Sequence, residues 1–400
     1  MKKICVIGLG YIGLPTAILF ALKGFKVLGF DTNASIVKNI NKGKSHIVEK
    51  DLDISLREVI KKKSFIAKTE PSEAEVFIIS VPTPHYLGKN NIYLPDITRI
   101  IDAIYSILPL LKENDLIILE STSPVGTTEK ISKLIQDNTS FKNNEIHVAY
   151  CPERVLPGNI FNELRTNDRV IGGLNEESSH KAKDLYSNIC DGEFFVTNTS
   201  TAEMVKLSEN AFRDVNIAFA NELSMVCDSI NIDVNELINL SNKHPRVNIL
   251  NPGCGVGGHC IAIDPWFIAS QFPDKTPLIQ QARHVNTKKT KWVLSKIKKL
   301  IENFKANKGF LPTIGCLGLT YKPNIDDIRE SPALKITRNL ILEGFKIYSA
   351  DPNLKEVHNI QLIDFNEVLE KSDLVFILVA HKEFELIQLD DQKVFNLSIS

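Results

Sequence analysis

Cys260 is the residue of this chain whose type and surroundings point most directly to chemistry. It lies in a glycine-rich segment, residues 253–265, where a tight turn could bring the backbone close to a ligand. If a helix began near Gly258, the helix dipole would favour the thiolate form of Cys260, which is the nucleophilic form. Asp264 lies four residues further on and would share the same helix face. A nucleophile beside an acid–base group is typical of covalent catalysis.

The same segment allows two other interpretations. A glycine-rich loop that holds a cysteine can be purely structural. A zinc site is the second alternative, and its ligands would be Cys254, His259 and Cys260. Because no second CxxC or HxxxH cluster in the sequence completes a tetrahedral set, we expect no metal.

The first residues of the chain carry a dinucleotide-binding pattern. An apolar run leads into Gly8, Gly10 and Gly13, a helical pattern follows, and a second predicted strand ends at Asp31. This order predicts a Rossmann-type site with the cofactor pyrophosphate at the helix N-terminus. The Asp31 carboxylate would bind the ribose hydroxyls and repel a 2′-phosphate, which favours NAD over NADP. The alternative for Asp31 is a simple turn at the strand end.

A thiol nucleophile in a chain that binds a nicotinamide cofactor predicts oxidation through covalent intermediates. An alcohol would first become an aldehyde, which the thiol would capture as a thiohemiacetal. A second oxidation would give a thioester, and water would open the thioester to a carboxylate.

The composition is that of an ordinary water-soluble protein. Of the 400 residues, 43% are hydrophobic and 24% are charged, and the formal net charge of −1 gives no indication of a nucleic-acid partner. The apolar start is broken by glycines and predicts a strand and a helix, not an export signal. No apolar run is long enough to predict a membrane span. Seven scattered cysteines fit free thiols in a reducing cytoplasm.

Three further strands are predicted in the first half of the chain, each followed by polar residues. They span 75–81, 116–120 and 146–150. The polar residues that follow them include Thr83, Thr122 and Glu153. In an open parallel sheet, these positions share the edge at which ligands bind.

Two long helices are predicted next, at about 201–231 and 277–305. One stripe of the first helix is polar and consists of Glu203, Lys206, Asn210 and Arg213. Such a stripe usually faces solvent. The apolar run 218–223 instead predicts that this helix is central and buried.

The C-terminal part of the chain repeats the pattern of its beginning. A strand at 313–319 ends in a glycine, residues 342–353 echo 22–33, and residues 372–377 echo 73–78. In the first turn, residues 320–332 replace the glycine pattern, so a different nucleotide is expected there. We therefore predict an α/β fold in which a long central helix joins two Rossmann-like, doubly wound domains. The predicted domains are an NAD-binding domain (1–198), a central helical domain with the cysteine loop and the dimer contact (199–306), and a nucleotide-sugar domain (307–400).

Taken together, these motifs resemble the family of nucleotide-sugar 6-dehydrogenases, which includes the UDP-glucose and GDP-mannose dehydrogenases. The resemblance covers nearly the whole chain, and its motifs occur in family order. They are 8–13, 121–128, 152–154, Lys206 with Asn210, 257–264, and Tyr321-Lys322 with Arg329. The resemblance implies a double oxidation of a sugar C6 alcohol to a carboxylate with two NAD per sugar. It also implies a homodimer or a higher homo-oligomer, no nucleic-acid or membrane partner, and a product destined for a bacterial surface polysaccharide.

The resemblance also implies roles for individual residues. Cys260 resembles the family nucleophile, and Lys206 and Asn210 resemble the groups that hold the developing oxyanion. Asp264 and Thr122 resemble residues that position water and pass protons, and Glu153 resembles the carboxylate linked to thioester hydrolysis. On its own, Lys206 could be a surface lysine. The group that deprotonates the first alcohol stays open.

Two sets of binding residues follow from the same resemblance. The expected cofactor-binding residues are Gly8, Gly10, Tyr11, Ile12, Gly13, Asp31, Thr83, Thr122 and Arg329. The expected substrate-binding residues are Glu153, Arg154, Val155, Leu156, Lys206, Asn210, Arg213, Arg246, Asn248, Asn251, Gly253, Gly257, Tyr321 and Lys322. Among these, Arg246 resembles an arginine that reaches into the site of the partner subunit, and residues 248–253 resemble a loop that cradles the diphosphate.

The match extends to the branch of the family that acts on UDP-N-acetyl-D-mannosamine, through residues 150–158, 167–173 and 213–223. Members that oxidise UDP-glucose usually carry a glutamate where this chain has Pro157. UDP-N-acetyl-D-glucosamine is the alternative substrate. A non-catalytic nucleotide-sugar-binding protein is the alternative of another class, although the intact site residues oppose it.

The chain departs from its relatives in two places. Cys254 stands where they often have proline, and we expect this thiol to be inert. Residues 393–400 lack an aspartate-rich strand end, so we expect the last strand to be altered.

Overall fold

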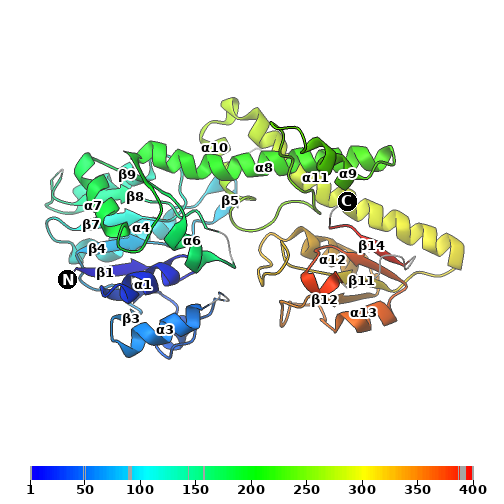
Figure 1. Ribbon diagram of the computed structural model, residues 1–400, viewed down its shortest axis with the longest axis horizontal. Coiled ribbons are helices and arrows are strands. Elements are labelled where there is room, and N and C mark those ends of the chain that lie inside the picture. Colours follow the sequence, from blue (N-terminus) through cyan, green and yellow to red (C-terminus); the bar gives the residue numbers. More distant parts are fainter. Residues whose placement is uncertain are drawn as a thin grey trace. The chain divides into compact units, whose positions relative to one another are not determined.

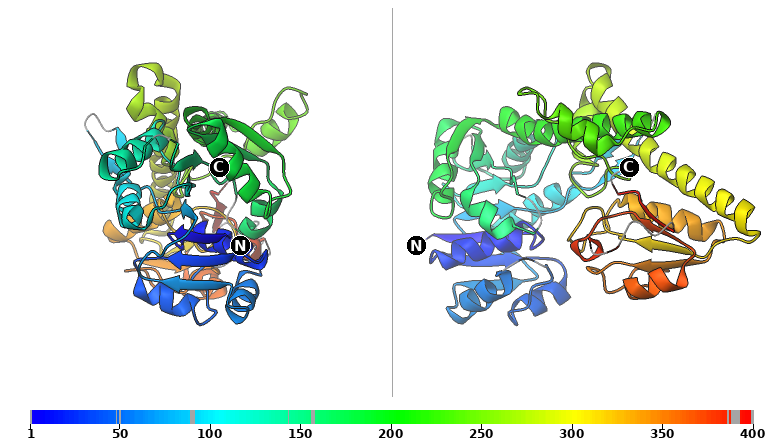
Figure 2. Two further views of the ribbon diagram at one scale, coloured as in Figure 1. Left: turned by 90° about the vertical axis from the view of Figure 1, so that its left-hand side faces the viewer. Right: turned by 45° about the vertical axis from the view of Figure 1, so that its right-hand side comes forward.

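The computed structural model describes residues 2–47, 49, 51–88, 92–142, 144–155, 158–385, 387 and 393–398. The chain divides into two compact units, Met1–Ser208 and Glu209–Ser400. Figures 1 and 2 show the elements of each unit, and the long helix α8 (Thr199–Ser229) runs from one unit into the next.

The first unit is built on a sheet with the strand order β10-β9-β8-β7-β4-β1-β2-β3. The strands are β1 (Lys3–Ile7), β2 (Lys26–Phe30), β3 (Phe65–Lys68), β4 (Val76–Ile79), β7 (Leu116–Leu119), β8 (His147–Tyr150), β9 (Arg169–Gly173) and β10 (Phe194–Asn198). Among these described strands, neighbours run parallel except β8 and β9, which are antiparallel. The chain leaves β1 for β2 and β3 and then returns to β4 on the other side. This reversal creates a crevice at the carboxyl ends of β1 and β4, where ligands of such sheets bind.

Helices cover both faces of this sheet. Its helices are α1 (Gly13–Leu22), α2 (Ala34–Ile40), α3 (Leu52–Lys61), α4 (Thr98–Ile107), α5 (Thr127–Asn138), α6 (Ile160–Thr166) and α7 (Glu176–Tyr186). On one face, residues of α1, α3 and α7 share a hydrophobic cluster with Ile4 and Val6 of β1, and on the other, residues of α4 and α5 share a cluster with Cys5 and Ile7. Burial on both faces explains why the strands read as continuous apolar runs. A separate hairpin, β5 (His85–Leu87) with β6 (Tyr93–Pro95), follows β4.

In the second unit, α8 packs along α11 (Pro277–Lys308). Both were expected to be long helices, and both are. The shorter helices α9 (Val234–Ser241) and α10 (Asp264–Gln271) lie between them in sequence. The contact between α8 and α11 includes buried polar groups, such as Asp214, which accepts hydrogen bonds from Arg283 and Asn286 at 2.6 and 2.8 Å. The expected burial of α8 holds for part of its surface in the single chain, because Leu207, Ala218 and Ala220 are buried whereas Phe212 and Phe219 are exposed.

The second unit also contains a sheet, with the order β12-β11-β13-β14 and parallel neighbours throughout the described strands. Its elements are β11 (Ile314–Leu317), α12 (Pro332–Leu342), β12 (Ile347–Ala350), α13 (Phe365–Lys371), β13 (Leu374–Ile377) and β14 (Val394–Asn396). The predicted repeat is confirmed, because β12, β11 and β13 pair as β2, β1 and β4 do. The last strand is short, but β14 still pairs with β13.

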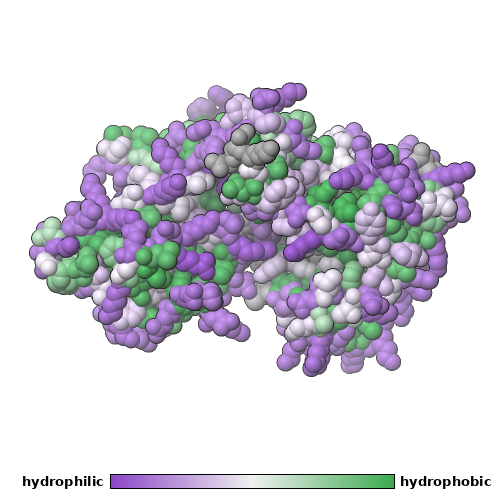
Figure 3. All heavy atoms as spheres, turned by 180° about the vertical axis from the view of Figure 1, so that it is seen from behind, coloured by the Kyte–Doolittle hydropathy of each residue, from purple (hydrophilic) through white to green (hydrophobic). Residues whose placement is uncertain are grey.

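Among the described residues, no helix is both long enough and apolar enough to cross a bilayer. Hydrophilic side chains occupy most of the face shown in Figure 3, and hydrophobic patches interrupt them on both units.

Candidate active site

The turn after β1 forms a cradle suited to a dinucleotide. Gly8 has φ +89°, and a Cβ there would lie 2.7 Å from the carbonyl oxygen of Ser80. A Cβ at Gly13 would lie 1.9 Å from the carbonyl oxygen of Gly8, so only glycine lets α1 approach the strand this closely. A Cβ at Gly10, in contrast, would meet no atom within 4 Å. The open space at Gly10 is on the side from which a pyrophosphate could approach the backbone.

Two polar side chains flank this cradle. Asp31 ends β2 and accepts hydrogen bonds from the amides of Leu9 and Asn33 at 3.1 and 2.8 Å, so its carboxylate is held at the crevice. Thr83 follows β4, and its buried hydroxyl has no hydrogen-bond partner among the described residues. An unsatisfied buried hydroxyl and a fixed carboxylate beside an open glycine turn fit a bound dinucleotide. Tyr11 and Ile12 complete the turn, with Ile12 directly before α1.

Lys206 of α8 and Glu153, which follows β8, form a buried pair in the first unit. The Lys206 ammonium donates to the Glu153 carboxylate at 3.1 Å and to its backbone carbonyl at 2.7 Å. Lys206 is only 5% exposed, so it is not a surface lysine. The other carboxylate oxygen of Glu153 accepts from the amide of Val155 at 2.9 Å. The pair therefore fixes the turn that begins at Glu153, although Leu156 and Pro157 lie outside the described residues.

Glu203, one turn before Lys206, ties α8 to the segment that carries Thr122. Its carboxylate accepts hydrogen bonds from the amides of Gly126 and Thr128, at 2.6 and 2.8 Å, and from the Thr128 hydroxyl at 2.7 Å. Burial raises the pKa of Glu203, and these three donors oppose that effect. The sequence pattern placed Glu203 on the polar stripe, and the structure shows it as an anchor for the N-terminus of α5.

Cys260 lies in the turn before α10 and not in the helix. The predicted helix start near Gly258 was wrong, because α10 begins at Asp264. The amides of Ile263 and Asp264 donate to the Cys260 carbonyl at 2.9 and 2.8 Å, so one helical turn joins Cys260 to the helix. Gly258 has φ +83°, which cannot belong to a right-handed helix. Cys260 is the one cysteine of the seven that is not fully buried.

Asp264 pairs with Asn210 inside the second unit. The Asn210 amide donates to the Asp264 carboxylate at 2.6 Å, and both side chains are buried, with exposures of 7% and 3%. Asn210 follows Lys206 by four residues in α8, so the two polar groups point from the same face of that helix. Arg213, the last member of the predicted stripe, is exposed.

The glycine loop before Cys260 rests on the turn that replaces the glycine pattern in the second sheet. A Cβ at Gly257 or Gly258 would lie 2.7 or 2.9 Å from Tyr321. The amide of Gly258 donates to the carbonyl of Arg329 at 2.9 Å. The guanidinium of Arg329 in turn makes bidentate hydrogen bonds to Asp327 at 2.6 to 3.0 Å. Lys322 is half-buried in the same turn.

The alternative zinc set is not brought together. Among the described residues, no group of three His, Cys, Asp or Glu side chains is arranged to hold a metal ion. The Cys254 thiol is buried and donates to the carbonyls of Leu378 and Leu397 at 3.4 and 3.3 Å. Burial raises its pKa to about 12, which agrees with the expected inert thiol.

The pKa of Asp327 is held well below its usual range: burial alone would raise it, but hydrogen bonds from His259 and Arg329 prevail.

Polar side chains fix the loop at residues 248–253. The side chain of Asn242 accepts a hydrogen bond from the amide of Ile249 at 2.7 Å and donates one to the carbonyl of Ile249 at 3.0 Å. The side chain of Asn221, on α8, accepts from the amide of Gly253 at 2.9 Å. Neither Asn221 nor Asn242 was among the expected site residues, since a single asparagine on a helix or directly after one forms no pattern. The predicted ligands Asn248, Asn251 and Arg246 themselves are exposed.

The chain matches one protein family along nearly its whole length. The NAD binding domain of that family matches residues 2–190, the central domain 200–288, and the UDP binding domain 315–397. The chain belongs to the UDP-glucose/GDP-mannose dehydrogenase family. It is therefore an NAD-dependent oxidoreductase, and the expected family, fold and cofactor are confirmed.

Individual relatives within this family cover almost all of the chain. It is 50% identical to the UDP-N-acetyl-D-mannosamine dehydrogenase of Campylobacter jejuni, over 97% of this chain and 98% of that protein. It is 45% identical to an NDP-N-acetyl-D-galactosaminuronic acid dehydrogenase of Ralstonia solanacearum, over 97% and 93%. The solved structure of a UDP-D-ManNAc dehydrogenase from Pyrococcus horikoshii superposes with a TM-score of 0.90 at 38% identity, over 98% and 93% of the two chains.

Proposed function

We propose that this enzyme oxidises UDP-N-acetyl-D-mannosamine at C6 to UDP-N-acetyl-D-mannosaminuronate, with two NAD reduced per sugar. The observation that carries the chemistry is the turn before α10, which holds a partly exposed thiol one turn from a buried carboxylate. The choice of sugar is supported by the 50% identity to the Campylobacter jejuni enzyme. The product would serve a bacterial surface polysaccharide.

In the proposed mechanism, NAD held by the turn at residues 8–13 and by Asp31 would supply the hydride acceptor for each of the two oxidations. The Cys260 thiolate adds to the C6 aldehyde and forms the C–S bond of a thiohemiacetal. Lys206, held in place by Glu153, and Asn210, held by Asp264, donate hydrogen bonds to the oxygen that becomes negative. The second oxidation converts the thiohemiacetal to a thioester without breaking the C–S bond.

Hydrolysis then releases the acid and restores the thiolate. Water adds to the thioester carbon, and the collapse of the tetrahedral adduct breaks the C–S bond. We propose that Glu153 takes the proton from this water, while Asp264 and Thr122 position the water and pass protons. Glu153 already accepts from Lys206 and Val155, so its carboxylate has a fixed direction.

The binding roles are proposed on the same basis. In the first unit, the cradle of Gly8, Gly10 and Gly13 with Asp31 would hold NAD, and Arg154 and Val155 would border the sugar. In the second unit, the loop at 248–253 and the turn with Lys322 would hold the diphosphate. The predicted division into 1–198, 199–306 and 307–400 is our proposal for the functional domains.

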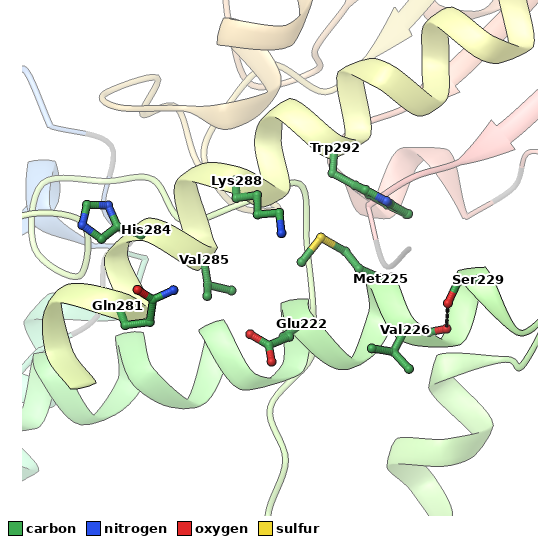
Figure 4. A pocket seen from close by; sticks show the side chains of 9 residues that line it. All are labelled: Glu222, Met225, Val226, Ser229, Gln281, His284, Val285, Lys288 and Trp292. Carbon is green, nitrogen blue, oxygen red and sulfur yellow. Dashed lines mark hydrogen bonds between the residues drawn. The ribbon is translucent and has the colours of Figure 1, made fainter. Parts of the chain in front are cut away.

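We also propose that the enzyme is a homodimer that works in the cytoplasm. On α8, the exposed residues Phe212, Phe219 and Val226 recur every seven positions, and their exposed fractions of 50 to 68% favour burial against a second copy. A groove of about 490 Å³ lies between α8 and α11, and Val226 is one of the residues that line it (Figure 4). None of the expected site residues lines this groove. A nucleophilic thiol and free cysteines suit a reducing compartment.

A substrate panel tests the proposed function. In assays that follow NADH, we expect kcat/KM for UDP-N-acetyl-D-mannosamine to exceed those for UDP-N-acetyl-D-glucosamine and UDP-glucose by at least about tenfold. UDP-N-acetyl-D-galactosamine belongs in the panel because of the relative from Ralstonia solanacearum. A preference for any of the three competitors would overturn the proposed substrate and leave the family assignment intact.

A further inference from the structure

The two sheets of the chain carry equivalent carboxylates directly after their equivalent strands β2 and β12, and these carboxylates differ in exposure. In the first unit, Asp31 accepts from the amides of Leu9 and Asn33 at 3.1 and 2.8 Å. In the second unit, the equivalent Asp351 accepts from the amides of Leu319 and Asn353, at 2.7 and 3.0 Å. Asp31 is partly exposed, whereas the side chain of Asp351 has no exposed surface.

His381 is the side chain that covers Asp351. Its Nε2 lies 3.1 Å from the Asp351 carboxylate, and the whole side chain is buried. His381 follows the end of β13 by four residues, as Thr83 follows the end of β4. In the first unit, the Thr83 hydroxyl has no hydrogen-bond partner among the described residues. At the equivalent position of the second unit, the His381 imidazole contacts the Asp351 carboxylate. The imidazole thus makes the contact with Asp351 that a ribose hydroxyl would make with Asp31 in the first unit.

The hydrogen bonds around His381 determine which ring nitrogen carries the proton. The amide of Asn324 donates to Nδ1 at 2.9 Å, and the side-chain amide of Asn353 lies 2.9 Å from the same nitrogen. A nitrogen that accepts from a backbone N–H carries no proton itself, so the proton of neutral His381 is on Nε2. Nε2 can then donate to Asp351, and the Thr320 hydroxyl lies 3.2 Å from the same nitrogen. Every polar atom of the ring therefore has a partner.

These contacts join both ends of the turn that carries Tyr321 and Lys322. Thr320 precedes these residues and Asn324 follows them, and His381 contacts both. The amide of Lys382 also donates to the Asn324 side chain at 3.1 Å, and Asn324 has φ +60°, a conformation that needs such support. The ring of Tyr321 in turn underlies the glycine loop that leads to Cys260. The position of the turn thus depends on a residue about 60 positions further along the chain.

We propose that His381 is a positioning residue that replaces a nucleotide ribose with an internal imidazole. By covering the Asp351 carboxylate, it excludes a dinucleotide bound in the manner of the first unit. By holding Thr320 and Asn324, it fixes Lys322 where a diphosphate can meet its ammonium group. The inference rests on the proposed function only for the identity of the ligand, a uridine diphosphate.

The test compares His381→Ala with wild type, using UDP as the probe for binding. We expect the Kd for UDP and the KM for the UDP-sugar to rise at least about tenfold, because several buried hydrogen bonds are lost. The KM for NAD should stay within about twofold, since the cofactor cradle is in the first unit. Val368→Ala is the matched control: Val368 is fully buried under the same sheet and contacts Gly315, and it should lower the Tm without changing the Kd for UDP.

Two conservative variants keep the inference testable if the alanine variant does not fold. In His381→Asn, the side-chain oxygen can accept from the Asn324 amide, whereas His381→Gln can reach Asp351 but leaves that amide without its acceptor. We therefore expect His381→Asn to retain more UDP affinity than His381→Gln. Equal UDP affinity in wild type and both variants would overturn the inference alone. A wild-type enzyme that binds no UDP would overturn the inference and the proposed function together.

Discussion

Replacing Cys260 with alanine is expected to lower acid formation on the order of 10⁴-fold or more, because loss of the nucleophile removes a step that other groups cannot supply. Binding of the UDP-sugar should change little, since the proposed binding groups of the second unit do not include the thiol. The measurement is the rate of carboxylate formation together with the Kd for the UDP-sugar.

Cys254→Ala is the matched control for this experiment. Cys254 lies six residues before Cys260, is buried, and has its pKa raised to about 12 by burial. This variant should keep most of the activity, with a loss of stability typical of a small buried truncation. A Cys260→Ala enzyme that forms acid at near the wild-type rate would rule out covalent catalysis at this residue.

Mixing two inactive variants should restore activity if the sites are shared between subunits. An Arg246→Ala chain lacks the arginine proposed to reach the partner, and a Cys260→Ala chain lacks the nucleophile. A mixed dimer then contains one site with both residues intact. With random exchange of chains, about one quarter of the wild-type activity should return. The exposed position of Arg246 suits such a role.

The control for this mixture pairs Lys206→Ala with Cys260→Ala. Because both residues are proposed to serve the site of their own chain, no mixed dimer contains an intact site, and activity should stay near zero. Mass spectrometry of the intact assemblies establishes that mixed dimers have formed. If they have formed and the Arg246 mixture stays inactive, Arg246 does not act across the interface.

The local patterns of the sequence predicted most of the fold. Gly8 and Gly13 are required by backbone geometry within one turn, and Gly10 leaves open space beside the same turn, so the spacing of the three glycines identifies the cradle. Strands buried on both faces appear as apolar runs, and their order along the chain implied the parallel sheets. The second α/β domain was visible because Gly318 and Asp351 repeat Gly8 and Asp31.

The predicted helix start near Gly258 was wrong for a physical reason. Glycines at 255 and 258 adopt positive φ values of 133° and 83°, which extend the loop beyond the point where the helix was expected. The available signal was Pro265, since proline favours the first turn of a helix and here follows Asp264 directly. Cys260 and Asp264 still lie one helical turn apart, because the amide of Asp264 donates to the Cys260 carbonyl.

Long-range partners could not be read from the sequence. His381 looks like a single histidine after an apolar strand, and its partner Asp351 lies 30 residues away. Asn221 reaches Gly253 across 32 residues, and Glu203 reaches Gly126 across 77. Such contacts arise only when the packed elements bring the side chains together. For a related reason, the sequence did not show which side chains of α8 stay exposed, since an apolar helix face has the same pattern whether it packs against its own chain or against a second copy.

The central claim, a double oxidation through Cys260, is tested most directly by the NADH yield per sugar. With UDP-N-acetyl-D-mannosamine limiting and NAD in excess, we expect two NADH for each sugar consumed and a carboxylate as the only product. Mass spectrometry of the nucleotide sugar identifies the oxidation state at C6 independently. A yield of one NADH with an accumulating aldehyde would contradict the claim, because the thiohemiacetal and thioester steps would then not occur.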